Sequence, residues 1–149
     1  MASAREQAVA ALEARLKTVT GLTVERNRAD PLDAIPAGGA AVLYDPPEPD
    51  ELVETIFSPA RYVLEATLDC EVAVRPGASA AATRTALDAL LEAIGTAVNG
   101  GDRSLGGLAE WIEAGAAAFT VAREEGTERF EAALVPITVQ YITSDPLGT

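Results

Sequence analysis

The chain has 149 residues, with one cysteine, no histidine and 23 acidic against 11 basic residues, which gives a formal net charge of −12. These counts exclude an intramolecular disulfide and the usual zinc, copper and haem ligand sets. They also argue against a surface that grips nucleic acid, because such affinity comes largely from Lys and Arg neutralising phosphates. The length suits a single domain over residues 1–149 with one hydrophobic core.

No segment has the pattern of a signal peptide or a membrane span. The first 17 residues include Arg5, Glu6 and Glu13, which a secretory leader would not carry at these places. The longest uncharged run, AALVPITVQYITS, is shorter than the roughly twenty residues that a spanning helix needs. We therefore expect a soluble protein that is made in the cytoplasm and has no membrane partner.

The first part of the chain predicts one helix and two strands. Ser3 is a cap and Gly21 a stop for a helix whose apolar residues recur at steps of three and four: Val9, Leu12, Leu16 and Val19. The segments LTVERN and AAVLYD are typical of short strands, and the proline- and glycine-containing residues 28–39 between them predict a loop.

An acidic, proline-rich loop follows at residues 45–51, with LVETIF after it as a strand. The loop carries four carboxylates, Asp45, Glu48, Asp50 and Glu51. A calcium site is one interpretation of these acids, but the ligand order and central glycine of an EF-hand are missing. A rigid, solvated loop is the interpretation that we favour.

The clearest alternation in the chain runs over residues 62–74 and predicts a long, half-buried strand. Cys70 falls on its apolar face, where a thiol behaves as a small hydrophobe. The opposite face carries Glu65, Asp69 and Glu71. These carboxylates are either an acid/base set in a cleft or, as we favour, a wet or inter-subunit face.

A second amphipathic helix is predicted over residues 76–101 from the stripe Leu87, Leu90, Leu91, Ile94 and Val98. The next segment, DRSLGG, could suggest a phosphate loop, but the only lysine of the chain is Lys17. We therefore expect Gly106 and Gly107 to form a turn.

The end of the chain predicts two more strand segments. Residues 108–123 form one, irregular at Gly115, followed by a hairpin tip at residues 124–128, and Trp111 is interpreted as a core or interface anchor. Residues 129–143 form the other, and Pro136 in its middle suggests an edge position or a bulge. The element order favours an α+β fold: a largely antiparallel or mixed sheet with two main helices packed on one face.

The residues offer no catalytic machinery of a familiar kind. Nucleophilic catalysis needs a positioned base, and histidine is absent. We expect a domain that is not an enzyme and that needs no cofactor or metal. A small hydrolase or transferase that uses Glu65, Asp69 and Glu71 is the alternative.

Three segments resemble one protein family. They are IPAGGAAVLYD, which follows the first helix, then DRSLGGLAEWIEA, and the closing VPITVQYITSDPLGT. Together they are similar to the tail terminator proteins of long-tailed phages, most closely the version in bacterial gene transfer agents and related prophages. The resemblance covers nearly the whole chain in order. It implies a homo-hexameric ring at the head-proximal end of the tail tube, which ends tube polymerisation and meets the head connector.

The resemblance also implies partners, a location and roles for residues. The partners are further copies of the chain, the tail tube protein, the head–tail connector or stopper protein, and DNA that passes through the ring without specific binding. The chain would lie in the tail of the particle, at the head junction. Six copies carry a formal charge of about −72, and an acidic channel would repel phosphate.

Two acidic sets are candidates to line that channel: the loop residues Asp45, Glu48, Asp50 and Glu51, or the strand residues Glu65, Asp69 and Glu71. Trp111, Asp145 and Leu147 are candidates for subunit contacts. A stopper or connector protein of the same junction is the alternative within the same class of particle.

Overall fold

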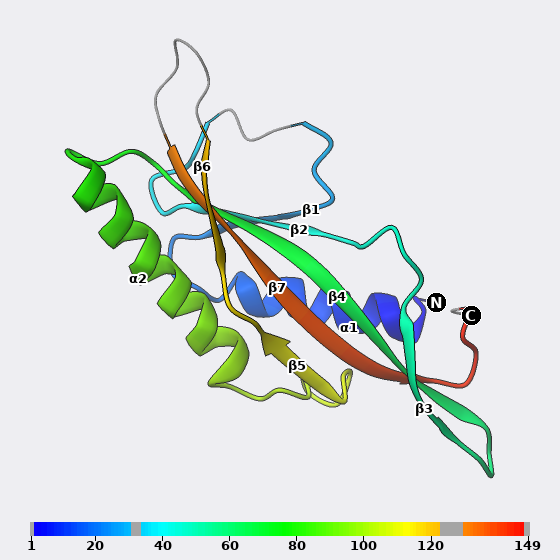
Figure 1. The fold of residues 1–149 in the computed structure, drawn as a ribbon. Coiled ribbons are helices and arrows are strands. Elements are labelled where there is room, and N and C mark those ends of the chain that lie inside the picture. Colours follow the sequence, from blue (N-terminus) through cyan, green and yellow to red (C-terminus); the bar gives the residue numbers. More distant parts are fainter. Residues whose placement is uncertain (1, 31–33, 123–129, 148–149) are drawn as a thin grey trace.

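The computed structural model describes residues 2–30, 34–122 and 130–147. This part of the chain has two helices and a mixed sheet of seven strands, so the predicted α+β class is confirmed (Figure 1). The elements are α1 (Ala4–Leu16), β1 (Thr23–Arg26), β2 (Ala40–Tyr44), β3 (Glu51–Ile56), β4 (Arg61–Val74), α2 (Ala80–Asn99), β5 (Trp111–Ala114), β6 (Ala118–Ala122) and β7 (Phe130–Thr143).

Both helices begin at a serine that caps the first turn. The Ser3 hydroxyl accepts from the backbone N–H of Glu6, and the Ser79 hydroxyl accepts from that of Ala82, each at 3.1 Å. These bonds satisfy backbone donors that have no partner inside a helix. The predicted cap at Ser3 is therefore confirmed.

The first helix is shorter than its apolar pattern predicts. It ends at Leu16, and the chain reaches Gly21, at φ 79°, through turns. The backbone N–H and the hydroxyl of Thr18 both donate to the carbonyl oxygen of Arg15, at 3.1 and 2.6 Å. These short-range bonds tighten the last turn and end the α-helix early.

The long strands β4 and β7 pair along their whole length and form the centre of the sheet. The other side of β4 is shared by β2 and β3, and the other side of β7 by β5 and β6. Strand β1 runs parallel to β2, which makes the sheet mixed. The acidic loop at residues 45–50 bridges the gap between β2 and β3 beside the middle of β4.

A second gap lies between β5 and β6, opposite Pro136 of β7. Gly115 in this gap donates its N–H to the carbonyl oxygen of Pro136 at 2.8 Å. Because the N and O of one residue face the same neighbour in an antiparallel ladder, the missing N–H of the proline faces the break. The predicted irregularity at Gly115 is confirmed. For Pro136 the predicted edge position is wrong, because β7 is paired on both sides, and the alternative of a bulge falls on the neighbouring segment, where residues 115–117 stand opposite residues 135–136. The predicted hairpin tip at residues 124–128 lies outside the described residues.

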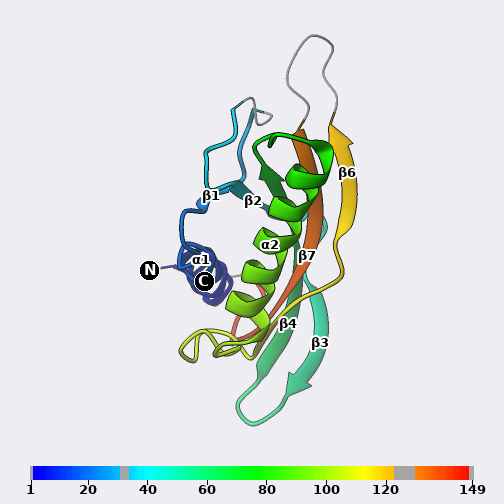
Figure 2. The same ribbon diagram turned by 90° about the vertical axis from the view of Figure 1, so that its left-hand side faces the viewer.

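The core lies between one face of the sheet and both helices, which cover that face side by side (Figure 2). The predicted apolar faces of β4 and β7 supply the sheet half of this core. Its central members are fully buried: Leu12, Leu16, Leu43, Leu68, Leu87, Ile94, Ile112 and Ile137. The thiol of Cys70 also lies here, with 0% of the residue exposed.

The other face of the sheet is covered at one end only. Ile35, in the loop between β1 and β2, packs there with Ala40, Ala73 and Ala132, and its carbonyl oxygen accepts from Arg75 Nε at 2.9 Å. At the other end the β3–β4 hairpin projects beyond the body of the molecule (Figure 1). The stretch of the face between these two ends carries most of the candidate residues.

Candidate functional site

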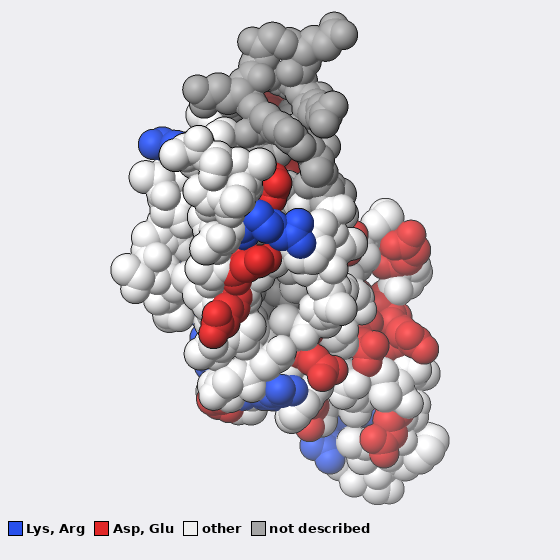
Figure 3. Space-filling model, turned by 60° about the vertical axis from the view of Figure 1, so that its left-hand side comes forward, with Lys and Arg blue, Asp and Glu red and all other residues white. Residues whose placement is uncertain are grey.

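The uncovered stretch of the sheet is acidic. Glu51 of β3 lies directly opposite Glu65 of β4, and Asp69 and Glu71 follow on the same face of β4. In the space-filling view, acidic side chains form several groups down the right-hand side, and few basic side chains accompany them (Figure 3). We name Glu48, Glu51, Glu65, Asp69 and Glu71 the acidic face.

The two acidic sets that the sequence offers as alternatives meet at this place. Glu48 and Glu51 from the loop and Glu65 from the strand border one shallow hollow of about 200 Å³. Glu65 also accepts a hydrogen bond from the side-chain amide of Gln140, at 2.8 Å, which fixes its direction across the sheet. Asp69 is exposed, whereas Glu65 and Glu71 are half-buried.

The carboxylates of the other two loop acids enter an ion-pair network; Asp50 also borders the hollow, and Asp45 does not. Asp45 binds Arg26 at 2.8 Å and Arg5 at 3.2 Å, and Asp50 binds Arg5 at 2.8 Å. Arg26 also contacts Glu6 at 2.5 Å, which ties α1 to β1. Asp45 and Asp50 therefore hold the loop in place, and the four loop carboxylates do not form one set.

Burial and pairing act in opposite directions on this network. Burial alone would raise the pKa of Asp45, but hydrogen bonds from Arg26 and Arg5 outweigh it and hold that pKa below its usual value of 3.8. Burial, together with a hydrogen bond that its hydroxyl donates to Asp50, raises the pKa of Tyr141. At neutral pH the carboxylate of Asp45 is charged and the phenol of Tyr141 is neutral.

A cleft of about 580 Å³ opens beside the network, between the start of α1, the acidic loop and the end of β7. Its lining includes Arg5, Asp50, Tyr141 and Leu147. Leu147 is 92% exposed, and its backbone N–H donates to the carboxylate of Asp145 at 2.9 Å. The strand ends at Thr143 as expected, and a subunit contact at Asp145 and Leu147 stays a prediction.

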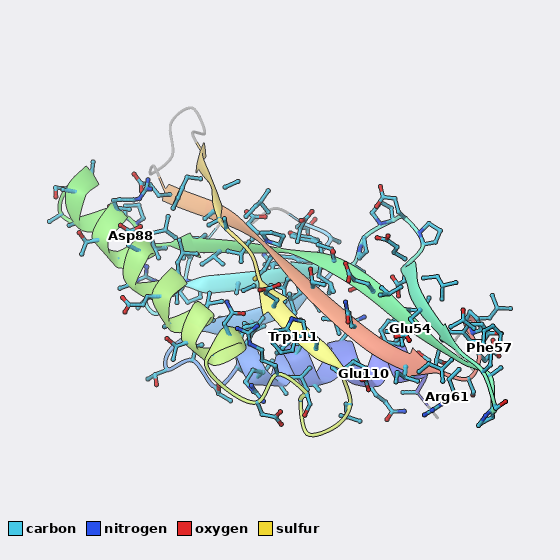
Figure 4. The ribbon with its side chains drawn as sticks, turned by 60° about the horizontal axis from the view of Figure 1, so that its bottom comes forward. Glu54, Phe57, Arg61, Asp88, Glu110 and Trp111 are labelled. Carbon is cyan, nitrogen blue, oxygen red and sulfur yellow. The ribbon has the colours of Figure 1, made fainter. Side chains whose placement is uncertain are left out.

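Trp111 stands on the uncovered face rather than in the core. It lies opposite Gln140, in the same cross-strand row as Glu65, and 42% of it is exposed. The guanidinium of Arg103 covers its ring at 4.3 Å (Figure 4 labels Trp111). An interface role for Trp111 stays a prediction; the alternative place in the core is wrong.

The glycine turn after α2 is built on positive backbone angles. Gly106 and Gly107 have φ of 71° and 91°, and a side chain at either would meet nothing within 4 Å. Asp102 accepts from the N–H groups of Ser104 and Gly106, both at 2.9 Å. Hydrogen bonds, led by that of the Ser104 hydroxyl, lower the pKa of Asp102 to about 2. The turn thus has the backbone geometry that only glycine adopts readily.

The structure can be compared with three functions: thiol chemistry, metal binding and membrane insertion. Burial raises the pKa of the Cys70 thiol to about 12, so the thiol is neutral at physiological pH. Among the described residues, no group of three or more Cys, Asp or Glu is placed to hold a metal ion. No helix in the described ranges is long and apolar enough to cross a membrane.

The residues that organise the site could not be identified from the sequence. Arg5, Arg26 and Tyr141 come from three separate elements, and no local pattern links them to the acidic loop. The places of Glu113 and Gln140 on the uncovered face could be predicted from the sequence. Side chains alternate along a strand, so the neighbours of the core residues Ile112 and Val139 point to the other face of the sheet.

No protein-family model matches the chain, and the comparison with curated proteins finds no match.

Proposed function

We propose that this chain is the tail terminator subunit of a phage-like particle. Copies form a ring at the head-proximal end of the tail tube, end its polymerisation and join the tail to the head connector while DNA passes through. The segment resemblance described above supports this class of protein. The acidic face supports the role in DNA passage and is the observation that carries the proposal.

A channel for DNA needs a wall that does not hold phosphate. At the strand positions of the uncovered face, in the described part of the chain, Arg61 is the one basic residue and the acids are Glu25, Glu51, Glu54, Glu65, Asp69, Glu71 and Glu113. Two of these acids, Glu25 and Glu113, are paired with Arg28 and Arg103 from neighbouring loops, and the acids of the acidic face make no ion pair with a described residue. A surface with a large excess of negative charge repels a polyanion, and the effect grows when several copies surround it. We therefore assign the acidic face to the channel wall.

A tube-length assay tests the proposal. The tail tube protein of the same particle is polymerised alone and with increasing amounts of the chain, and tube lengths are measured by negative-stain electron microscopy. The chain should shorten the tubes in proportion to its concentration and lie at one end only. Lengths that do not depend on the chain would contradict the proposal.

A further inference from the structure

The β3–β4 hairpin presents an apolar tip to solvent. Phe57 at the tip is 78% exposed, and Leu52 and Val53 on β3 are about half exposed, at 53% and 48%. The tip lies beyond the helices and the core (Figure 1). Large apolar side chains gathered on a projecting arm are typical of a docking element.

The same tip carries an unpaired cation. Arg61 faces Ile56 across the hairpin. Within the described ranges, Arg61 alone of the Lys and Arg side chains has no hydrogen bond, ion pair or ring contact. Because the chain has a net charge of −12, a second copy offers this cation many acidic side chains as partners.

A groove on the helical side of the molecule is complementary to the hairpin tip in both polarity and charge. It measures about 480 Å³ and lies between the turn that follows α1 and the outer side of α2. Small side chains form much of its wall, among them Thr18, Thr20, Ala89, Ala93 and Ala97. Glu92 stands in this wall, and it makes no ion pair with any described residue.

The tip and the groove cannot meet within one chain. Figure 4 shows Phe57 and Arg61 at one end of the molecule and Asp88, one helical turn from Glu92, at the other. We propose that the hairpin tip of one copy docks in the α1–α2 groove of a second copy, with Phe57 in the groove and Arg61 paired with Glu92.

The occupant is a second copy because every copy carries both halves of the contact. A contact between two different surfaces repeats from copy to copy and closes into a ring when its rotation allows. The pairing of Arg61 with Glu92 also offsets part of the repulsion between two acidic chains. This inference rests on the ring of the proposed function and names the surfaces that join its subunits.

Engineered cysteines test the contact directly. The full chain with Ala60→Cys, in the hairpin turn beside an intact Phe57, and Ala93→Cys is oxidised mildly and run on a non-reducing gel; Cys70 is buried and stays unreactive. A ladder of covalent multimers is expected from the double variant and none from either single variant. No ladder, or dimers from Ala60→Cys alone, would overturn the inference.

Association measurements give a second, independent reading. Phe57→Ala should weaken self-association about 30-fold, the size of an interface hot spot. Phe119→Ala removes another exposed phenylalanine and should change it less than threefold. Arg61→Glu and Glu92→Arg should each weaken association, and the two together should restore it. Equal losses from Phe57→Ala and Phe119→Ala, or no restoration by the double charge reversal, would overturn the contact.

The two proposals fail separately. If Phe57→Ala ends tail tubes at the dose of the unaltered chain, the proposed function stands and the contact is wrong. If the unaltered chain ends no tubes, the proposed function is wrong, and the cysteine ladder still decides the contact.

Discussion

Gly115 and Pro136 face each other across the one break in the ladder beside β7, joined by a backbone hydrogen bond of 2.8 Å. A Cβ on Gly115 would lie 3.0 Å from Cγ of the proline ring, which is tighter than ordinary van der Waals contact. The glycine and the proline therefore fit each other sterically as well as through the hydrogen bond.

Gly115→Ala should destabilise the fold by about 1 kcal/mol, because the rigid ring cannot move aside. In a Pro136→Ala background the same change should be neutral or stabilising by up to about 1 kcal/mol, since alanine restricts the unfolded chain. Urea unfolding of the four proteins measures the coupling. Equal effects of Gly115→Ala in both backgrounds would rule out the steric fit.

Asp45→Asn should destabilise the protein by about 1–3 kcal/mol at pH 7, because Arg5 and Arg26 lose a charged acceptor. The pKa of Asp45 is lowered in the folded state, so its contribution is present above about pH 4 and is lost as pH falls through the folded value. The stability difference between the two proteins should therefore shrink below pH 4. Glu48→Gln removes an exposed carboxylate of the same loop and should change stability at pH 7 by less than about 0.5 kcal/mol.

Gly106→Ala should cost about 1 kcal/mol or more, because its φ of 71° disfavours a side chain even in open space. Gly95→Ala is the matched control. It lies inside α2 with nothing within 4 Å of the added methyl, so it should stabilise by about 0.5–1 kcal/mol. Thermal unfolding of both variants shows whether each substitution stabilises or destabilises the protein. A stabilising Gly106→Ala would refute the backbone explanation of the turn.

Neutralising the acidic face should slow DNA passage without affecting tail length. A particle with Glu65→Gln, Asp69→Asn and Glu71→Gln should deliver DNA several-fold less efficiently at low salt, with a smaller loss at high salt. Glu13→Gln with Asp88→Asn removes charge from the helical side and should leave delivery unchanged. Equal losses in the two variants would mean that the acidic face has no special role.

The strands and helices with regular apolar periods could be predicted from the sequence. The alternation of β4 gives its buried side, and the stripe from Leu87 to Val98 gives the buried side of α2, because the core follows these periods. The end of α1 could not be predicted, since the bonds of Thr18 to Arg15 compete locally with the helix. Pro136 looked like an edge residue because the break that accommodates it lies on another segment.

The candidate site divides in the same way. The acids of β4 and the loop could be identified from the sequence, but their separation into a structural pair and an exposed face depends on Arg5 and Arg26, which reach them only in the folded chain. The distinction between Asp45 and Glu48, three residues apart, is therefore a property of the tertiary structure.

Electron microscopy of particles from producing cells that lack the chain decides whether this chain ends the tail tube at the head junction. We expect tail tubes of variable and excessive length with no heads attached, and normal particles when the chain is supplied again. Tails of normal length joined to heads in the absence of the chain would contradict this role.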